Sequence, residues 1–528
     1  MPTNTTSLAS LHASASNIRK LTYMLHGFVF ALGSVVVIYA PSIVFFPPSD
    51  IAIPSAVLMI AFGLLFIFSY SLTHRASLAG IMTTLFVLAL FYHWILNALA
   101  VGLILGSLLI LGIIRRRISL DDLHAVSCVV SVLLVGFFFY QFLKVSVIPS
   151  IHIRPQTLPP VSGDQQEFSA GKDRPDIYYI ILDGYGQAEM LQALHGYDNS
   201  NFISALQARG FVVASHSRAN YPRSVLSLSS SLNMQYLDPL STSMGDSYLW
   251  WPLTGIIHQS LVRQFVEETG YRFVSIASGW DFTNVSNPEV YEKPYSIVLK
   301  DFQKDFFMRT SLRYLGYLDQ SLISFPSYDA YRRMIVFGFE ALPEIASKIG
   351  SKFVFAHILA PHPPFVFDEN GNPINPDYQL TLGDKPFMFK SLADYEHGYF
   401  SELAFVNRMT IKAVDAILAQ SKTHPVIIIQ GDHGPGMIGN YDYFNSACLY
   451  ERFSILNAYY LPNATPGLIP NDISPVNTFR IVFNEYLGTD FEILPNRQYY
   501  NFDGSMYQFR DVTTQIGSTC EIPENGSP

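Results

Sequence analysis

The sequence predicts an α/β protein in two parts: an N-terminal bundle of five transmembrane helices and a C-terminal domain whose central sheet is flanked by helices. Three observations support this. Only 14% of the 528 residues are charged and 49% are hydrophobic, whereas soluble domains carry about 25% charged residues. The longest apolar stretches lie within the first 147 positions. Beyond them, short apolar runs alternate with helical patterns, which is typical of α/β sheets.

Five stretches without Asp, Glu, Lys or Arg are each long enough to span a bilayer, which takes about 17–25 residues of helix. They cover residues 21–42, 51–72, 76–96, 98–114 and 125–143. A signal peptide would explain only the first stretch, and buried core helices do not explain five in succession. We therefore expect residues 1–147 to form a membrane domain. The predicted spans carry no internal charge, which argues against a transporter.

The basic residues orient this domain. Arg19 and Lys20 precede the first span, Arg75 follows the second, and residues 115–117, all arginine, follow the fourth. With five spans, these positions fall on one side of the membrane, which the positive-inside rule identifies as the cytoplasm. The odd number of spans then places everything after about residue 146 outside the cytoplasm.

A proline-rich segment separates the two parts. Residues 148–175 contain Pro149, Pro155, Pro159 and Pro160 among Ser, Gln and Gly, which is typical of an extended linker. The remaining residues, 176–528, are enough for one large domain with its own core.

Polar side chains follow three predicted strands of this domain. Strands are expected at residues 177–182, 211–214, 273–277, 353–356 and 426–429, and helices at 199–209 and 401–420. Asp183 comes directly after the first strand, His357 and His362 follow the fourth, and Asp432 and His433 follow the fifth. Ligands of open α/β sheets bind beyond the carboxyl ends of the strands. Taken singly, these residues also fit a helix cap, a core histidine or a polar turn. Together, two carboxylates and an imidazole at one edge indicate a divalent-metal site.

A serine-rich helix offers a nucleophile. In "NYPRSVLSLSSSLNMQYL" the apolar spacing predicts a helix that begins near Ser224. A helix N-terminus presents unpaired N–H groups and the positive end of the dipole, which favour an anion. Ser224 is equally suited to be a simple N-cap. Four further serines compete for any catalytic role: Ser227, Ser229, Ser230 and Ser231.

Charge and cysteine content narrow the function further. The net charge of −9 argues against a nucleic-acid partner, which would require a basic face. Three cysteines form neither a disulfide framework nor a zinc-ligand cluster. Cys448 and Cys520 are able to pair in an oxidising compartment.

Four segments together resemble the alkaline phosphatase/sulfatase superfamily: "IILDGYG", "NYPRSVLSLSSSLNM", "HILAPHPPF" and "IIIQGDHGPG". With five spans before them, the chain resembles the membrane-bound lipoteichoic acid synthases and lipid A phosphoethanolamine transferases within that superfamily. The resemblance implies a sulfatase-like fold for residues 176–528. It also implies a location in the bacterial inner (cytoplasmic) membrane, with the catalytic domain on the periplasmic or extracellular side.

The resemblance assigns roles to individual residues. Ser224 matches the nucleophile, which is usually threonine in the transferases, and Asp183, Asp432 and His433 match ligands of one divalent ion, Zn²⁺ or Mn²⁺, that also binds Ser224. His362 matches the histidine that contacts the phosphate, and His357 lies five residues earlier as a second substrate-binding position. The ligands of a complete second metal site are not apparent. The sulfatase signature, Cys or Ser followed by x-Pro-x-Arg, is absent.

The function implied is metal-dependent transfer of a phospho-alcohol group from a membrane phospholipid to a glycan or lipid acceptor, through a phosphoseryl intermediate. Phosphoglycerol and phosphoethanolamine both fit as the transferred group, with a lean towards phosphoglycerol because cysteines are sparse. The alternative is a membrane-anchored hydrolase, such as a phosphodiesterase, phosphatase or sulfatase, that uses the same site with water as acceptor.

Overall fold

The computed structural model of the chain comprises two compact units. Unit 1 consists of Met1–Ser150 and Leu299–Gln320, and unit 2 of Ile151–Val298 and Ser321–Pro528. The structure describes residues 28–29, 31–36, 38–86, 129, 133, 136, 140, 174–285, 289–310, 313, 323–324, 326–377, 380–381, 383, 389–501 and 505–520.

Unit 1 contains the apolar helix α2 (Ala52–Thr73), which follows two short 3-10 helices, η1 (Ala40–Ser42) and η2 (Pro48–Ile51). The side chains of Ile60, Leu64 and Ile67 on α2 are 63–65% exposed. Such a stripe of large apolar side chains is typical of a surface that faces lipid or a partner. The helix ends at His74, whose φ of 50° terminates the helical hydrogen bonding.

The five predicted spans are described to different extents. Among the described residues, one helix, Pro48–Thr73, is long and apolar enough to cross a membrane, which matches the second predicted span. The first and third predicted spans appear as the shorter apolar helices Ala31–Ser42 and Ala76–Phe86. The fourth span, and the fifth apart from four residues, lie outside the described residues. Where five spanning helices were predicted, the described residues therefore provide one candidate.

Unit 1 also contains a helix from the second half of the chain, α11 (Asp301–Met308). Lys300 Nζ lies 2.8 Å from Asp50 Oδ1, and the ring of Phe302 packs edge-on against Tyr39 at 5.3 Å. The predicted domain boundaries assigned this segment to the extracytoplasmic domain. Local sequence patterns carry no information about such a distant contact, so the sequence gives no sign of it.

Unit 2 is built on a seven-stranded sheet with the order β2-β7-β6-β1-β5-β3-β4. Its strands are β1 (Ile177–Leu182), β2 (Val212–Val213), β3 (Arg272–Ile276), β4 (Val290–Glu292), β5 (Lys352–Ile358), β6 (Val426–Gly431) and β7 (Asn457–Tyr460). The central strands β6, β1 and β5 are parallel, and β7 pairs antiparallel with β6. The five strands predicted from the sequence are confirmed to within two residues at each end.

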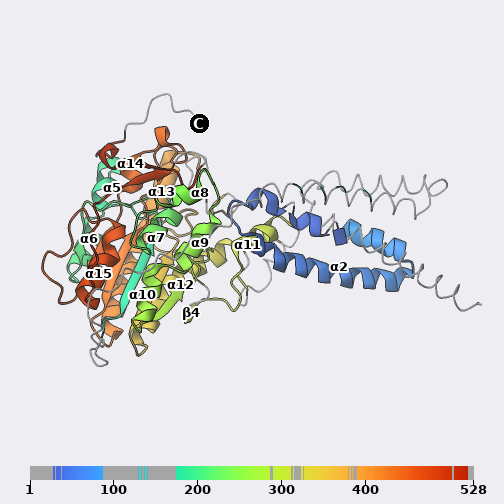
Figure 1. The fold of residues 1–528 in the computed structure, drawn as a ribbon, viewed down its shortest axis with the longest axis horizontal. Coiled ribbons are helices and arrows are strands. Elements are labelled where there is room, and N and C mark those ends of the chain that lie inside the picture. Colours follow the sequence, from blue (N-terminus) through green and yellow to red (C-terminus); the bar gives the residue numbers. More distant parts are fainter. Residues whose placement is uncertain are drawn as a thin grey trace, which may run out of the picture. The chain divides into compact units, whose positions relative to one another are not determined.

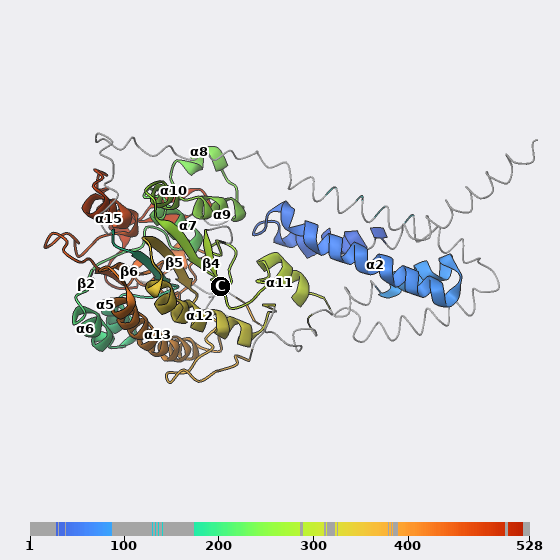
Figure 2. The ribbon, with the colours of Figure 1, turned by 90° about the horizontal axis from the view of Figure 1, so that it is seen from below.

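Helices cover both faces of this sheet, as Figure 2 shows. One face packs against α5 (Ala188–His195), α6 (Ser200–Gln207), α12 (Tyr328–Ser347) and α13 (Leu392–Gln420). The other packs against α7 (Ser224–Ser231), α9 (Trp251–His258), α10 (Leu261–Glu268) and α15 (Thr478–Leu487). Alternate residues of β1 point to opposite faces, Ile180 to the first and Ile181 to the second, and both are buried. The predicted α/β architecture with flanking helices is confirmed (Figure 1).

Short elements complete unit 2. They are α8 (Leu240–Met244), α14 (Leu449–Phe453), β8 (Tyr499–Asn501), β9 (Phe509–Asp511) and the 3-10 helices η5 (Phe444–Ser446), η6 (Pro475–Asn477) and η7 (Thr513–Gln515). Cys448 and Cys520 are joined by a disulfide, with their Cα atoms 5.1 Å apart, inside the usual range for such a bond. This bond ties the C-terminal segment to the residue that precedes α14.

Candidate metal centre and nucleophile

Three of the predicted site residues lie at the carboxyl edge of the central strands. Leu182 of β1 pairs with Gly431 of β6, so Asp183 and Asp432 follow neighbouring strands at the same level. His357 is the sixth residue of β5, beside Ile181. The parallel order β6-β1-β5 is thus what brings together side chains from three distant parts of the sequence.

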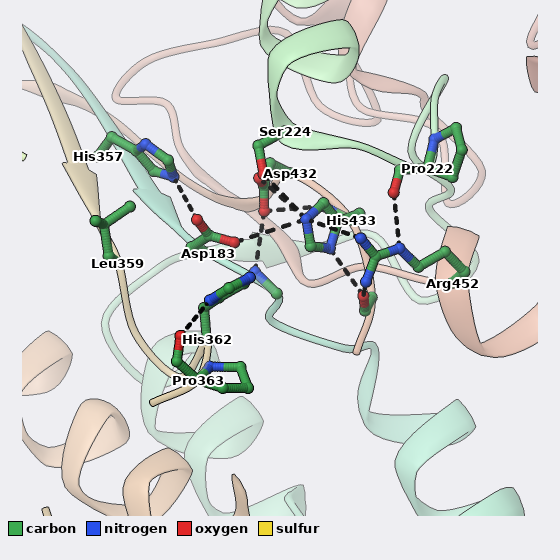
Figure 3. Close-up of polar contacts among 12 residues, drawn as sticks. Asp183, Pro222, Ser224, His357, Leu359, His362, Pro363, Asp432, His433 and Arg452 are labelled. Atoms are coloured by element: carbon green, nitrogen blue, oxygen red, sulfur yellow. Dashed lines mark hydrogen bonds and ion pairs between the residues drawn. The ribbon is translucent and has the colours of Figure 1, made fainter. Parts of the chain in front are cut away.

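Four polar atoms face one another at this edge (Figure 3). The Oγ atom of Ser224 lies 3.0 Å from Nε2 of His433. The same nitrogen lies 3.6 Å from Oδ1 of Asp183 and 3.6 Å from Oδ2 of Asp432. All four residues are buried, at 8% exposure or less. The structure therefore brings together the four residues that the sequence analysis assigned to a metal.

The two carboxylate oxygens have no hydrogen-bond partner among the described residues. Oδ1 of Asp183 and Oδ2 of Asp432 are both buried and unsatisfied. The other oxygen of Asp432, Oδ1, accepts from the backbone N–H groups of Gly184 and His433, each at 3.0 Å. Burying an unpaired carboxylate oxygen costs several kcal/mol. Two such atoms pointing at one imidazole nitrogen indicate that a cation completes the site.

The tautomer of His433 follows from its contacts. Nδ1 lies 2.9 Å from the carbonyl oxygen of Gly434, and a carbonyl only accepts, so Nδ1 carries the hydrogen. In the neutral ring, Nε2 then carries the lone pair, and it faces the Ser224 hydroxyl. A Cβ atom on Gly434 would lie 1.9 Å from the carbonyl oxygen of Glu451. The glycine after Asp432–His433 is therefore required for close packing, which explains part of the "GDHGPG" motif.

Ser224 is the first residue of α7, as predicted, and its preceding residue, Arg223, makes no side-chain cap. The first N–H groups of a helix mostly lack partners within the helix, although here the Leu226 N–H donates to the Arg223 carbonyl oxygen at 3.0 Å; the start of α7 therefore favours an anion near the serine. The competing serines have other environments. Ser230 donates to the carbonyl oxygen of Gln235, and the buried hydroxyl groups of Ser227 and Ser229 have no hydrogen-bond partner in the described part of the chain. Ser224 is the serine of α7 that contacts His433.

His357 contacts Asp183, a candidate metal ligand, instead of an open surface. Its Nε2 lies 3.3 Å from Oδ2 of Asp183, and its Nδ1 lies 2.8 Å from Oγ1 of Thr283. Burial opposes ionisation of Asp183, but the imidazoles of His362, His357 and His433 outweigh it and hold the pKa of this carboxyl below its ordinary value. Substrate binding by His357, expected from the sequence, stays a prediction; its contacts with Asp183 and Thr283 also suit an orienting partner or an additional metal donor.

His362 lies at the partly exposed side of the cluster. It belongs to a proline-rich loop with two cis peptide bonds, Ala360–Pro361 and Pro363–Pro364. The ring of His362 is 6.4 Å from that of His433, centre to centre, and its Nδ1 lies 2.6 Å from the carbonyl oxygen of Pro363. Glu402 of α13 holds the same loop by accepting from the Val366 N–H at 2.7 Å. This position, beside the donor cluster and less buried, is compatible with contact to a bound phosphate.

The donor set fits a divalent metal ion. Asp183, His357 and Asp432 each offer a ligand atom within 4.8 Å of the others. His433 and Ser224 add an imidazole nitrogen and a hydroxyl oxygen, as described above. Carboxylate and imidazole ligands in this proportion suit Zn²⁺ and Mn²⁺.

The sequence analysis missed one residue of the site, Arg452 of α14. Its guanidinium is buried at 3% exposure. Nη2 lies 3.4 Å from Nε2 of His433, as Figure 3 shows. Nothing in the surrounding sequence "LYERFS" marks this arginine, because α14 reaches the site only through the tertiary fold.

No protein-family model and no curated protein sequence matches the chain. Solved structures do resemble it. The C-terminal periplasmic domain of EptC from Escherichia coli, in complex with Zn, is 12% identical over 65% of this chain and 94% of its own, with a TM-score of 0.42.

The integral membrane lipooligosaccharide phosphoethanolamine transferase A from Neisseria meningitidis is 13% identical over 90% of this chain and 79% of its own, with a TM-score of 0.40. A 2-O GAG sulfatase is 14% identical over 62% and 78% of the two chains, with a TM-score of 0.37. These solved structures are thus two phosphoethanolamine transferases, one of them a periplasmic domain, and a sulfatase.

Proposed function

We propose that this protein transfers a phospho-alcohol group, phosphoglycerol or phosphoethanolamine, from a membrane phospholipid to a glycan or lipid acceptor, with Ser224 as the nucleophile. One observation carries the proposal. The hydroxyl group of Ser224 lies 3.0 Å from His433 Nε2, and this nitrogen is flanked by the two buried carboxylate oxygens that lack a partner. A serine held beside a ready-made cation site is suited to nucleophilic attack on phosphorus.

Each side chain of the site has a separate role in this proposal. Asp183, Asp432 and His433, with Ser224, would hold the divalent ion, and His357 would orient Asp183 through its second oxygen. When bound, such an ion supplies Lewis-acid stabilisation of the serine oxygen and of the phosphoryl oxygens. His362 and the first N–H groups of α7 would contact the phosphoryl oxygens, whose charge is delocalised over the group being transferred.

The reaction balances in two steps. In the first, Ser224 Oγ forms a bond to phosphorus, the phosphorus–oxygen bond to diacylglycerol breaks, and the serine proton ends on the diacylglycerol oxygen. In the second, an acceptor hydroxyl forms the bond to phosphorus and the serine oxygen leaves, regaining a proton that the acceptor has lost. The phosphoseryl intermediate makes this a ping-pong cycle.

A membrane anchor suits this chemistry, because donor and leaving diacylglycerol both reside in the bilayer. The apolar helix Pro48–Thr73 supports such an anchor, and the disulfide Cys448–Cys520 supports an oxidising compartment for unit 2. We include in the proposal a multi-pass location in the bacterial inner membrane, with unit 2 on the periplasmic or extracellular side.

Mass spectrometry of the full-length protein tests this function. The protein is incubated with vesicles of phosphatidylglycerol or phosphatidylethanolamine carrying an isotopic label in the headgroup. We expect a labelled phospho-alcohol adduct on the Ser224 peptide with one of the two lipids. The variant Ser224→Ala should lose the adduct and at least roughly 10³-fold in turnover, as other enzymes do when the nucleophile is removed.

The matched control is Ser229→Ala, which removes a buried and unpartnered hydroxyl of the same helix and should leave turnover intact. An adduct on another serine would refute Ser224 as the nucleophile. Label that appears only in soluble phosphate esters would identify the enzyme as a hydrolase instead.

A further inference from the structure

Arg452 is a buried cation that joins the two loops of the site. Its Nε donates to the carbonyl oxygen of Pro222 at 2.7 Å, and its Nη1 donates to that of Gly434 at 3.2 Å. Pro222 lies two residues before Ser224, and Gly434 directly follows His433. One side chain therefore bridges the loop of the nucleophile and the loop of the imidazole (Figure 3).

The guanidinium is suited to this bridge because it is planar and rigid. Its N–H groups point in fixed directions, so acceptors bonded to them are held at a fixed separation. Its third contact, Nη2 to His433 Nε2 at 3.4 Å, lies on the same nitrogen that faces Ser224. A lysine ammonium, with all its donors on one atom, cannot reproduce three contacts spread over two loops.

Arg452 also fixes the group that orients His433. The Gly434 carbonyl oxygen accepts from His433 Nδ1 at 2.9 Å and from Arg452 Nη1 at 3.2 Å. In metal sites, the histidine nitrogen that does not bind the metal donates its hydrogen to an acceptor such as this carbonyl oxygen. That hydrogen bond sets the direction of the nitrogen that binds the metal. Arg452 stabilises this acceptor and thereby the direction of His433 Nε2.

The arginine is itself held on several sides. Its guanidinium lies over the ring of Tyr441, 3.9 Å from the centre. Its backbone carbonyl accepts from the Gly434 N–H at 2.8 Å, and the disulfide at Cys448 anchors the start of α14. An arginine fixed in this way is able to hold the two loops without reorganising.

We propose that Arg452 is a positioning residue that sets His433 Nε2 against Ser224 Oγ and so determines the metal affinity of the site and the reactivity of the serine. The second part rests on the proposed function. The first part depends only on the metal site and is measured without any turnover.

The test compares Arg452→Lys with Arg480→Lys in the full-length protein. Arg480 of α15 is a matched control outside the site, since it also donates three hydrogen bonds, two to Met234 O and one to Glu492 O. Each protein is stripped of metal with a chelator and titrated with Zn²⁺ alone by calorimetry. We expect Arg452→Lys to weaken Zn²⁺ binding about tenfold to hundredfold, as loss of an outer-sphere partner does. Arg480→Lys should leave the affinity unchanged, even where both variants melt at lower temperature.

An Arg452→Lys protein that binds Zn²⁺ as tightly as the wild type would overturn the proposal, and so would an equal loss in Arg480→Lys. Should Arg452→Lys fail to fold, Tyr441→Leu tests the same point. It removes the ring under the guanidinium but keeps the charge, and should weaken binding about two- to fivefold; unchanged affinity would contradict the proposal.

Activity measurements distinguish the effect of Arg452 on the reactivity of Ser224 from its effect on metal affinity. Where the wild type forms the Ser224 adduct, Arg452→Ala should lose turnover (kcat) more than apparent substrate affinity (KM), and added guanidinium ion should restore part of kcat. A wild type that binds Zn²⁺ but forms no adduct on any serine would overturn the transfer reaction, and the Zn²⁺ titrations would still decide the role of Arg452.

Discussion

Two buried clusters in unit 2 contain the same chemical groups, a histidine between two carboxylates, but satisfy them differently. In the candidate metal centre, oxygens of Asp183 and Asp432 have no hydrogen-bond partner among the described residues. In the second cluster, His195 binds both of its neighbours, Glu396 through Nδ1 at 2.8 Å and Glu451 through Nε2 at 3.1 Å.

The second cluster is closed by further bonds. Glu451 also accepts from the backbone N–H groups of Met437 and Ile438, at 3.2 and 3.0 Å. Burial would by itself lower the pKa of His195, but Glu451 and Glu396 outweigh it and raise that pKa above its ordinary value. Both ring nitrogens of His195 are therefore already occupied by carboxylates, unlike the nitrogen of His433 that faces Ser224. The residue types in a cluster therefore do not distinguish a metal site from a structural ion pair. Buried polar atoms that have no hydrogen-bond partner do distinguish them.

Removing a carboxylate from the candidate metal centre should have the largest effect. It should reduce Zn²⁺ binding and turnover without reducing stability. Asp432→Asn keeps the Oδ1 acceptor for the N–H groups of Gly184 and His433 and replaces the unpartnered oxygen by an amide. We expect loss of Zn²⁺ binding and at least about a 10³-fold loss of turnover, with a melting temperature of the metal-free protein equal to or above that of the wild type. Calorimetry measures Zn²⁺ binding, release of label from the phospholipid measures turnover, and thermal denaturation measures the melting temperature.

Asp176→Asn is the control. Asp176 is as buried as Asp432, but its Oδ2 lies 2.6 Å from Lys352 Nζ. Its substitution leaves a buried lysine without its partner and should destabilise the protein while Zn²⁺ affinity is kept. A stability loss in Asp432→Asn as large as in Asp176→Asn would contradict the distinction drawn here.

The sequence predicted the site residues at the carboxyl edge of the sheet better than the residues that support them from other elements. Asp183 and Asp432 follow strands whose apolar runs are evident, and the parallel pairing of β1 with β6 then brings them together. Ser224 was placed by the start of its helix. By contrast, Arg452 and His195 reach their partners through α14 and α5, and no local pattern encodes those contacts. His357 was recognised as a site residue, but its orientation towards Asp183 depends on Thr283, which lies far away in the sequence.

Breaking the second cluster should reduce stability and spare the metal site. His195→Leu leaves the buried carboxylate of Glu451 without its counter-charge, which costs about 3–5 kcal/mol for a buried pair; the partly exposed Glu396 should add little. His216→Leu is the matched control: His216 forms a comparable pair with Glu189, but both side chains are more than half exposed, so little change is expected. Chemical denaturation of the full-length proteins measures both, and Zn²⁺ affinity should be unchanged in each. A His195→Leu protein as stable as His216→Leu would show that the cluster contributes nothing.

Glu402 represents a third case, a buried carboxyl group whose raised pKa favours the protonated, uncharged form. It is fully buried on α13, Oε1 has no hydrogen-bond partner among the described residues, and burial raises its pKa to about 8. A carboxyl whose pKa is higher in the folded than in the unfolded chain stabilises the fold most below its ordinary pKa, and this stability is lost as the pH rises through about 8. Glu402→Gln mimics the protonated form and still accepts from the Val366 N–H.

We therefore expect Glu402→Gln to be close to the wild type near pH 5 and to be more stable by roughly 4 kcal/mol at pH 9, because it has no proton to lose. Thermal denaturation of both proteins across this range measures the difference. Equal pH dependence of the two proteins would show that Glu402 is ionised in the fold. In that case the carboxyl would have to be balanced by a nearby cation, as in the other two clusters, and Arg332 and His362 are the charged groups that favour its ionised form.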